Sequence, residues 1–398
     1  MGGHNIAIAG CGPGGLTAAL FLHRLGHKVT LYERFEEPQP VGSGLLVQPS
    51  GLAVLGELGL DGAIRSQGAR IDFLKGTSIL SGKRALDMRY SALKGDQCAF
   101  GVHRSLLFGT LYEAVRAEGI AIETGHIVTH AEDGRFLFAG GASSPRFDCL
   151  VDALGARTPL TPPCGGDLAY GALWATLDWP EAGGFPADAL DQRYRRAREM
   201  AGVMPIGTNP TSGKLGAAFF WSVRADRVEA LHAAGTEAWK AEVIALWPET
   251  EKLVAQIADA RDMVFAHYAH RTVSRPVDAN QRLAHLGDAW HSTSPQLGQG
   301  ANMALLDAAG LGAAFERHAD IADALAHYAW LRASHIQLYQ AMSRFFTPLY
   351  QSDDGFRPFV RDQLVHYFAG LWPARNLVAA IVSGNLGWPL RPMGMGKA

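Results

Sequence analysis

The feature that most constrains this chain is a glycine-rich turn close to its start, Gly10-Cys11-Gly12-Pro13-Gly14-Gly15. A short apolar strand is expected before it, over Asn5 to Ala9. Leu16 to Leu25 has the apolar spacing of a helix, and Lys28 to Tyr32 reads as a second strand. A strand, a glycine turn, a helix and a strand in this order predict a compact βαβ unit.

The turn also carries a specific binding pattern. Gly10, Gly12 and Gly15 fit G-x-G-x-x-G, in which the glycines permit a tight turn, the approach of a pyrophosphate and close helix packing. Glu33 ends the second strand, where a carboxylate can accept hydrogen bonds from a ribose. A glycine-rich turn with a solvated glutamate is the plain alternative. The combination predicts dinucleotide binding but does not separate NAD from FAD.

Composition narrows the class of protein. The chain has 398 residues, with 48% hydrophobic and 19% charged residues and a formal net charge of −2. This balance predicts a globular protein and gives no basic surface for nucleic acid or for a membrane. No apolar run approaches the roughly 18 residues of a membrane span. Its four scattered cysteines favour a reducing compartment, so a cytoplasmic location is expected.

A second, distant element lies between Arg282 and Asn302 and is the most specific signal in the chain. Asp288 follows a short strand and can accept a hydrogen bond from a ribityl hydroxyl. Gly298 and Gly300 allow the backbone to approach a flat ring. Asn302 opens a helix whose N-terminus can stabilise negative charge on a reduced isoalloxazine. The element therefore favours a flavin.

This element resembles the GD motif of the single-component flavin hydroxylases, the para-hydroxybenzoate hydroxylase-like family. The resemblance also includes Glu33-Arg34, the Gly42-Ser43-Gly44 loop and Arg104, and it extends to about residue 330. It implies that Pro295 packs beside the flavin ring and that Arg104 contacts FAD, with a solvated arginine as the alternative. The residues expected to bind FAD are Gly10, Gly12, Pro13, Gly14, Gly15, Glu33, Arg34, Gly44, Arg104, Asp288, Pro295, Gly298, Gly300, Ala301 and Asn302.

The expected fold is α/β: a Rossmann-like FAD-binding domain with an inserted sheet-bearing substrate domain and C-terminal helices. Residues 1–168 and 271–330 are assigned to the FAD-binding domain. Residues 169–270 alternate extended segments with one helical stretch and are assigned to substrate binding. Residues 331–398 are expected to be helical.

One departure from the family concerns the electron donor. The family has a middle motif, Gly-Ala-Asp-Gly, that the resemblance connects with FAD and NADPH. This chain has Leu154 at the motif aspartate, and Asp152 lies two positions earlier. An isobutyl group cannot make the hydrogen bonds of a carboxylate. NADPH or NADH is therefore an uncertain donor, and reduced flavin from a separate reductase stays open.

Few other residues carry a specific prediction. Trp174, Phe220 and His267 are expected in the substrate pocket, and His291 is expected near the flavin ring with Pro295. His267 and His270 lie in an extended segment without carboxylates, so no metal site is expected.

The resemblance implies an FAD-dependent monooxygenase, an oxidoreductase that uses O₂ through a flavin C4a-hydroperoxide to hydroxylate a small aromatic or unsaturated substrate. Two enzymatic alternatives remain: a flavin oxidase or dehydrogenase that removes hydride, and a flavoprotein fed with electrons by a reductase. A reductase or flavin-binding regulatory protein is a further alternative. Flavin-dependent halogenation is disfavoured because its paired tryptophans are not visible. A homodimer is left open.

Overall fold

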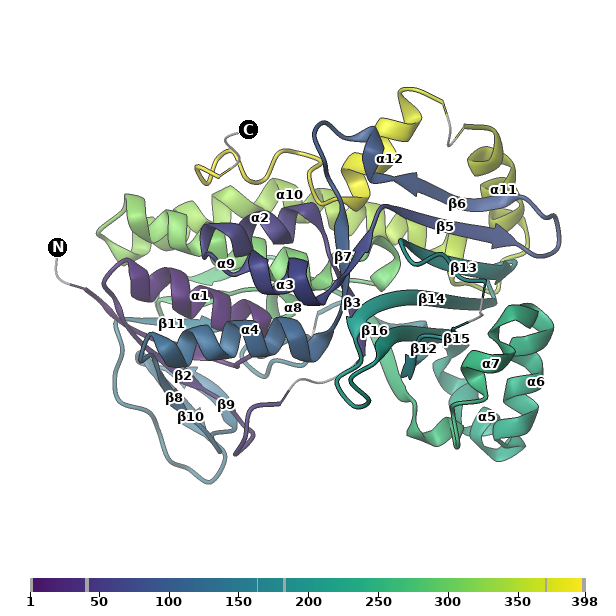
Figure 1. The fold of residues 1–398 in the computed structure, drawn as a ribbon. Helices are drawn as coiled ribbons and strands as arrows, with labels where there is room; N and C mark the ends of the chain where they lie inside the picture. Colours follow the sequence, from purple (N-terminus) through teal and green to yellow (C-terminus); the bar gives the residue numbers. More distant parts are fainter. Residues whose placement is uncertain (1–2, 40–42, 163, 182–183, 369–370, 396–398) are drawn as a thin grey trace.

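The computed structural model describes residues 3–39, 43–162, 164–181, 184–368 and 371–395. Gly42 of the expected Gly42-Ser43-Gly44 loop lies outside these residues. A mainly parallel sheet with its helices forms one half of the molecule, and a second, mainly antiparallel sheet forms the other (Figure 1). The α/β class predicted from the sequence is confirmed.

The first sheet has six strands in the order β17-β18-β11-β1-β2-β8. All neighbours are parallel except β17 and β18. This is the Rossmann-like arrangement expected from the βαβ unit. The strands are β1 (Asn5–Ala9), β2 (Lys28–Tyr32), β8 (Ala121–Glu123), β11 (Cys149–Asp152), β17 (Val277–Asp278) and β18 (Leu283–His285).

Alternation along β1 divides its side chains between two apolar layers. Ile6 and Ile8 pack with the helices on one face, and Ala7 and Ala9 pack beneath a hairpin on the other. The helices are α1 (Pro13–Arg24), α2 (Pro49–Glu57), α3 (Asp61–Gln67), α4 (Arg104–Ala117) and α9 (Gly300–Arg317), and the hairpin is β9 (Val128–Glu132) with β10 (Arg135–Phe138). The short helix α8 (Asp288–His291) follows β18.

The second sheet has seven strands in the order β16-β12-β15-β14-β13-β5-β6. Five of them come from the segment expected to hold the substrate domain: β12 (Gly166–Asp178), β13 (Ala189–Arg195), β14 (Glu199–Thr208), β15 (Leu215–Arg224) and β16 (Val264–Thr272). The other two, β5 (Phe73–Ser78) and β6 (Arg84–Arg89), come from within residues 1–168. The sequence boundary at 168 therefore does not separate the two sheets, because β5 crosses over to pair with β13.

Helices cover one face of this second sheet. They are α5 (Val228–Ala234), α6 (Thr236–Leu246) and α7 (Glu251–Val254). Phe219 and Trp221 pack toward this layer, whereas Trp174 and Phe220 point to the opposite face. Successive aromatic residues on β15 thus serve two different layers, as the period of a strand requires.

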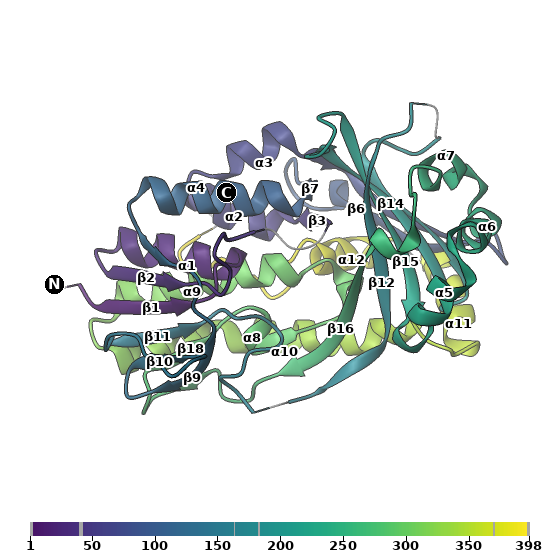
Figure 2. The same ribbon diagram turned by 90° about the horizontal axis from the view of Figure 1, so that it is seen from below.

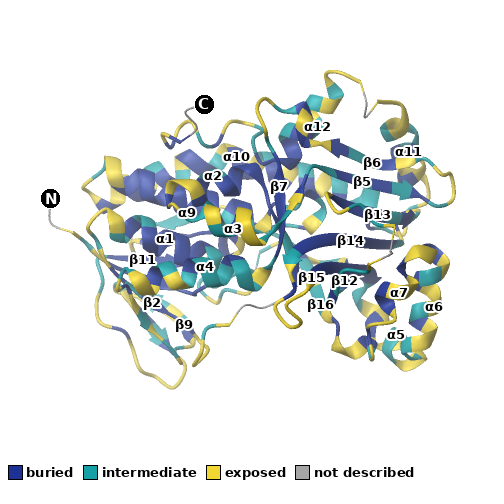
Figure 3. Cartoon of the chain, in the orientation of Figure 1, coloured by how far each residue is buried: buried dark blue, intermediate teal, exposed yellow. Residues whose placement is uncertain are grey.

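The C-terminal helices join the two halves. The long helix α10 (Ile321–Tyr350) packs on α9 and reaches the second sheet, where α11 (Phe356–Phe368) and α12 (Ala374–Val382) follow (Figures 1 and 2). Its start lies at Ile321, before the expected boundary at 331. A small sheet of β3 (Gly44–Val47), β7 (Ala99–His103) and β4 (Ala69–Ile71) lies at the junction. The buried residues concentrate along α9 and the central strands (Figure 3). Among the described residues, no helix is long and apolar enough to cross a membrane.

Candidate active site

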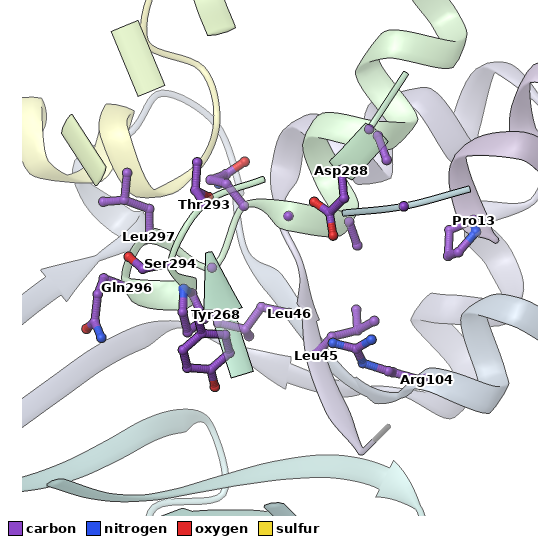
Figure 4. A pocket seen from close by; sticks show the side chains of 18 of the residues that line it. Pro13, Leu45, Leu46, Arg104, Tyr268, Asp288, Thr293, Ser294, Gln296 and Leu297 are labelled. Carbon is purple, nitrogen blue, oxygen red and sulfur yellow. The ribbon is translucent and has the colours of Figure 1, made fainter. Parts of the chain in front are cut away.

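A large cavity lies between the two sheets, with a volume of about 1060 Å³ (Figure 4). Pockets for one small ligand generally fall near 300–1,000 Å³, so this cavity has room for a cofactor together with a substrate. Its walls come from the glycine turn, the 293–301 loop, the inner face of the second sheet and the C-terminal helices.

The three fingerprint glycines have different roles in the structure. A methyl group at Gly12 would meet no protein atom within 4 Å, so the backbone there is open to the cavity. At Gly10 (φ +104°) it would lie 2.5 Å from the Ala153 carbonyl oxygen, and at Gly15 it would lie 2.0 Å from the Gly10 carbonyl oxygen. Gly12 therefore leaves space for a ligand, while Gly10 and Gly15 allow the strand, turn and helix to pack closely.

The helix that follows begins at the cavity wall. Pro13 is at its first turn, where the missing N–H costs nothing, and Pro13 and Gly14 both line the cavity. The start of α1 thus points its free N–H groups and the positive end of its dipole to a site suited to an anion.

Glu33 is held by the backbone around it. Its Oε2 accepts a hydrogen bond from the Cys11 N–H at 2.9 Å, and its Oε1 accepts from the N–H groups of Arg34 and Phe35 at 2.9 and 3.2 Å. The side chain is nearly buried, yet it lines the cavity, as does Arg34. These bonds fix a carboxylate beside the backbone of Cys11, the residue before Gly12, where it can meet a ribose.

The second element forms the opposite wall. Gly287 has φ +58° and turns the chain into Asp288, which lines the cavity. The Asp288 residue is exposed to the cavity; desolvation by the protein packed around its carboxyl raises its pKa, and the charges of His291 and Arg104 oppose the shift. Figure 4 shows Pro13, Asp288 and Arg104 apart from Tyr268 across the cavity.

The loop that leads into α9 lies along the centre of the cavity. Pro295, Gly298, Gly300 and Ala301 all line it. Gly298 has φ +61°, a left-handed conformation that glycine adopts without strain, and a methyl group at Gly300 would meet nothing within 4 Å. The N-terminus of the 18-residue helix α9 therefore opens on this space.

Two expected cofactor residues make close contacts with other parts of the protein. Asn302 does not line the cavity: its Nδ2 donates to the carbonyls of Leu46 and Gly298 at 3.0 and 3.1 Å, and its Oδ1 accepts from the Gln48 N–H at 2.9 Å. Gly44 does line the cavity, but a methyl group there would lie 2.5 Å from the Ala218 Cβ. Asn302 thus joins the loop at Gly298 to β3, whereas Gly44 allows β3 to pack closely on the second sheet.

The middle motif, in which Leu154 stands at the aspartate position, contains one acid, Asp152, and this acid has a structural role. Leu154 lines the cavity, whereas Asp152 is fully buried. Asp152 accepts hydrogen bonds from the Leu154 N–H at 3.0 Å and the Thr158 hydroxyl at 2.6 Å, and it pairs with His285 Nδ1 at 2.8 Å. Asp152 thus holds the turn that follows β11 and joins it to β18, so it does not take the place of the motif aspartate at Leu154.

His291 does not line the large cavity and serves as a hydrogen-bonding residue behind it. Its Nε2 lies 2.6 Å from Asp307 Oδ2, because α8 turns the imidazole inward to α9. Asp307 also accepts from the Gly287 N–H at 2.8 Å and from Arg332 Nε at 2.7 Å. His291 and Arg332 hold the pKa of Asp307 below its usual range although burial opposes this. The sequence analysis missed this network, since an acid and an arginine on two separate helices carry no local signal.

On the substrate side, the structure places Trp174 and Phe220 in the cavity lining, with ring centroids 4.7 Å apart. His267 is wrong as a pocket residue. It is exposed and its ring nitrogen contacts the Leu168 carbonyl, because its neighbour on β16, Tyr268, takes the inward position. Alternation along the strand could have suggested Tyr268 instead. Within the described ranges, no three histidine, cysteine or acidic side chains gather as metal ligands.

The C-terminal helices contribute a wall that was not expected. Residues of α10, α11 and α12 line the cavity: Phe346, Tyr350, Leu364, Val365, Phe368, Ala374, Val378, Ile381 and Val382.

Comparison with known proteins identifies the glycine-turn half of this site. Residues 4–137 match the family described as FAD binding domain. This chain carries an FAD-binding domain. FAD-dependent urate hydroxylase of Klebsiella pneumoniae is 26% identical over 341 residues, 83% of this chain and 86% of that protein. The 6-hydroxynicotinate 3-monooxygenase of Pseudomonas fluorescens is 26% identical over 331 residues, 76% of this chain and 80% of that protein.

The fold agrees with these relatives. The solved structure of Klebsiella pneumoniae HpxO complexed with FAD and uric acid superposes with a TM-score of 0.79 at 24% identity, covering 96% of this chain and 98% of that one. The resemblance to the flavin hydroxylases is therefore confirmed, and so is the expectation of an FAD-dependent oxidoreductase of the monooxygenase type.

Proposed function

We propose that this protein is an FAD-dependent monooxygenase that hydroxylates an aromatic or heterocyclic compound with O₂. The observation that carries the proposal is the continuity of the cavity: one space runs from the glycine turn and Glu33, past Asp288 and the 295–301 loop, to the apolar wall of the second sheet. A cofactor at the first end and an organic substrate at the second would share this space. The names of the two relatives, for urate and 6-hydroxynicotinate, support an aromatic or heterocyclic substrate.

The residues fit FAD in type and position. The open backbone at Gly12 and the start of α1 would hold the pyrophosphate, and the fixed carboxylate of Glu33 would accept from the ribose. Asp288 would accept from the ribityl chain, and Arg104 would add a positive charge close by. The bound flavin would supply the two-electron chemistry and the reaction with O₂.

The protein's own contribution is to orient charge and exclude water. The N-terminus of α9 at Gly300 would stabilise negative charge that develops near it. Pro295 and Leu297 cover the loop with apolar surface, and the inner face of the second sheet does the same opposite them. A site that excludes water would limit side reactions with solvent.

Labelled oxygen tests this function against a flavin oxidase. The purified FAD-loaded protein would be supplied with reduced nicotinamide, ¹⁸O₂ and a panel of phenols and hydroxylated N-heterocycles. Label in the product supports hydroxylation. Hydrogen peroxide formed in step with an unlabelled, dehydrogenated product would support the oxidase alternative.

The source of electrons is the second part of the proposal. Because Leu154 gives the cavity wall an isobutyl group where a carboxylate was expected, we propose that reduced flavin is produced slowly by NADPH or NADH alone. Anaerobic mixing with each nicotinamide, with dithionite as the control, measures this directly. Rapid bleaching by NADPH would rule out the need for a separate reductase.

A further inference from the structure

The charged residues of the cavity are unevenly distributed. The arginines that line it are Arg34, Arg104 and Arg157, and all of them belong to the glycine-turn half. Among the described lining residues of the second sheet and of α10–α12, the one charged side chain is Asp87. It is paired with Arg84 at 2.6 Å and with Arg89 at 3.3 Å, and both of these arginines are exposed. A substrate carboxylate would therefore be desolvated there without a cation to pair with.

The same part of the cavity is lined by aliphatic surface on two sides. Leu74, Met200 and Met204 project from the sheet, and Val365 and Val378 face them from α11 and α12. Methionine adapts to irregular apolar shapes. Leu364 and Phe368 on α11 line the cavity and are also 52% and 53% exposed, so the apolar lining extends to residues that solvent reaches. An apolar chain of several carbons would meet aliphatic and aromatic side chains along this side.

The Tyr268 hydroxyl, on β16 of the second sheet, can donate a hydrogen bond to a ligand in the cavity. The Trp174 indole donates a hydrogen bond to the Tyr268 hydroxyl at 3.0 Å, so the Tyr268 oxygen is the acceptor. Its own proton is donated to no residue that the structure describes. Two other tyrosines that line the cavity are committed: Tyr194 donates to Gln192 at 2.6 Å, and Tyr350 donates to the Ala85 carbonyl at 3.0 Å.

Tyr268 is suited to a neutral acceptor. Burial raises its pKa to about 12, against the smaller opposing effects of Trp174 and Arg104, so it stays protonated at neutral pH. Tyr268 lies beside the 293–301 loop, apart from Pro13 and Asp288 (Figure 4). A donor without a full positive charge binds a hydroxyl or carbonyl oxygen and does not compensate the desolvation of an anion.

We propose that the cavity takes an uncharged aromatic or heteroaromatic substrate that carries an apolar chain. Its ring oxygen would accept a hydrogen bond from Tyr268, and its chain would lie between the second sheet and helices α11 and α12. This inference rests on the proposed function for the presence of FAD, but it concerns which substrate binds and not how the substrate reacts.

Binding to the FAD-loaded protein tests the substrate class without turnover. Three probes would be titrated while the visible spectrum of the flavin is followed: 4-heptylphenol, 4-methylphenol and 4-hydroxybenzoate. Each fully buried methylene is worth about a fourfold gain in affinity. With a chain that is partly buried, 4-heptylphenol should bind on the order of a hundredfold more tightly than 4-methylphenol. The carboxylate probe should bind at least about tenfold more weakly than 4-methylphenol.

Two variants separate the chain from the ring. Val378→Trp fills the space between α12 and the sheet. It should weaken the binding of 4-heptylphenol by about tenfold or more and leave the affinity for 4-methylphenol unchanged. Leu377→Trp is the matched control, since Leu377 is exposed and does not line the cavity. Tyr268→Phe removes the hydroxyl donor and should lower the affinity for both phenols to the same degree, by about two- to tenfold. Flavin content and circular dichroism verify folding, and Val378→Phe replaces the larger change if Val378→Trp does not fold.

The binding experiment can fail or succeed independently of the proposed monooxygenase activity. Equal affinity for the heptyl and methyl phenols, or preferred binding of 4-hydroxybenzoate, would overturn the substrate class even if ¹⁸O enters a product. Preferred binding of 4-heptylphenol that depends on Val378 and Tyr268 would support the class even if the labelled-oxygen experiment shows an oxidase.

Discussion

The guanidinium of Arg332 on α10 lies 2.7 Å from the carboxylate of Asp307 on α9, and neither side chain is exposed to solvent. The same carboxylate accepts a hydrogen bond from the Gly287 N–H. The pair therefore connects the long C-terminal helix to the turn that precedes Asp288. A buried ion pair that does not itself line the cavity thus holds one wall of the proposed flavin site.

Removal of one member of this pair should be costly. Asp307→Ala leaves the Arg332 charge buried and unpaired, so we expect the free energy of unfolding to fall by about 3–5 kcal/mol. Denaturant unfolding followed by circular dichroism measures the change. As a control, Glu118→Ala removes the exposed pair with Arg24 and should cost less than about 1 kcal/mol. Equal effects of the two substitutions would contradict the assigned role.

His335 should make the protein less stable in acid. Burial, reinforced by the Arg332 charge, lowers its pKa from 6.5 to about 3. In the unfolded chain His335 is therefore protonated below about pH 6.5, whereas in the folded protein it stays neutral down to about pH 3. The stability from neutral His335 is complete above pH 6.5 and declines as the pH falls between these values.

His335→Gln tests this effect because an amide can still accept from Arg332 and donate to the Gly384 carbonyl. The loss of unfolding free energy between pH 7 and 5 should be about 1–2 kcal/mol smaller in the variant than in the wild type. Parallel pH profiles for the two proteins would show that another group is responsible.

Gly12 and Gly15 should respond differently to the same substitution. A methyl group at Gly12, where φ is −70°, enters open space, so Gly12→Ala should leave the melting temperature unchanged and weaken FAD binding by about tenfold or more. At Gly15 the methyl group would lie 2.0 Å from the Gly10 carbonyl oxygen, so Gly15→Ala should destabilise the fold itself. Fluorescence titration of the apoprotein with FAD and thermal unfolding separate the two effects. A lower melting temperature for Gly12→Ala would refute the distinction.

Glu33 is expected to contribute to FAD affinity through its charge. Glu33→Gln has one acceptor oxygen where the carboxylate has two, and it loses a charge-assisted bond to the ribose. We expect FAD affinity to fall by about 10- to 100-fold. Glu37→Gln removes a neighbouring charge that does not line the cavity and should change affinity less than about twofold. FAD binding that is insensitive to Glu33→Gln would argue against a ribose contact.

The flavin half of the molecule could be predicted because its signals are local. The strand before Gly10, the helix after Gly15 and the acid at Glu33 lie within 30 residues and obey simple periodicities. The Asp288 element has a similar compact signature. In these segments the turn geometry itself demands particular residue types, so sequence and structure agree.

The substrate half could not be predicted in the same way. Strands β5 and β6 join a sheet whose other members lie far along the chain, and nothing in Phe73–Ser78 specifies β13 as its partner. The choice between His267 and Tyr268 depends on one residue of strand register. The contribution of Val378 depends on how α12 docks. Long-range packing decides all of these.

The cavity also has a temporal consequence. Its lining begins at Gly10 and includes Val382, near opposite ends of the chain. During synthesis the fingerprint leaves the ribosome long before the wall built by α12. The pocket can therefore close only after Val382 has been made, so its assembly depends on residues more than 370 positions after Gly10.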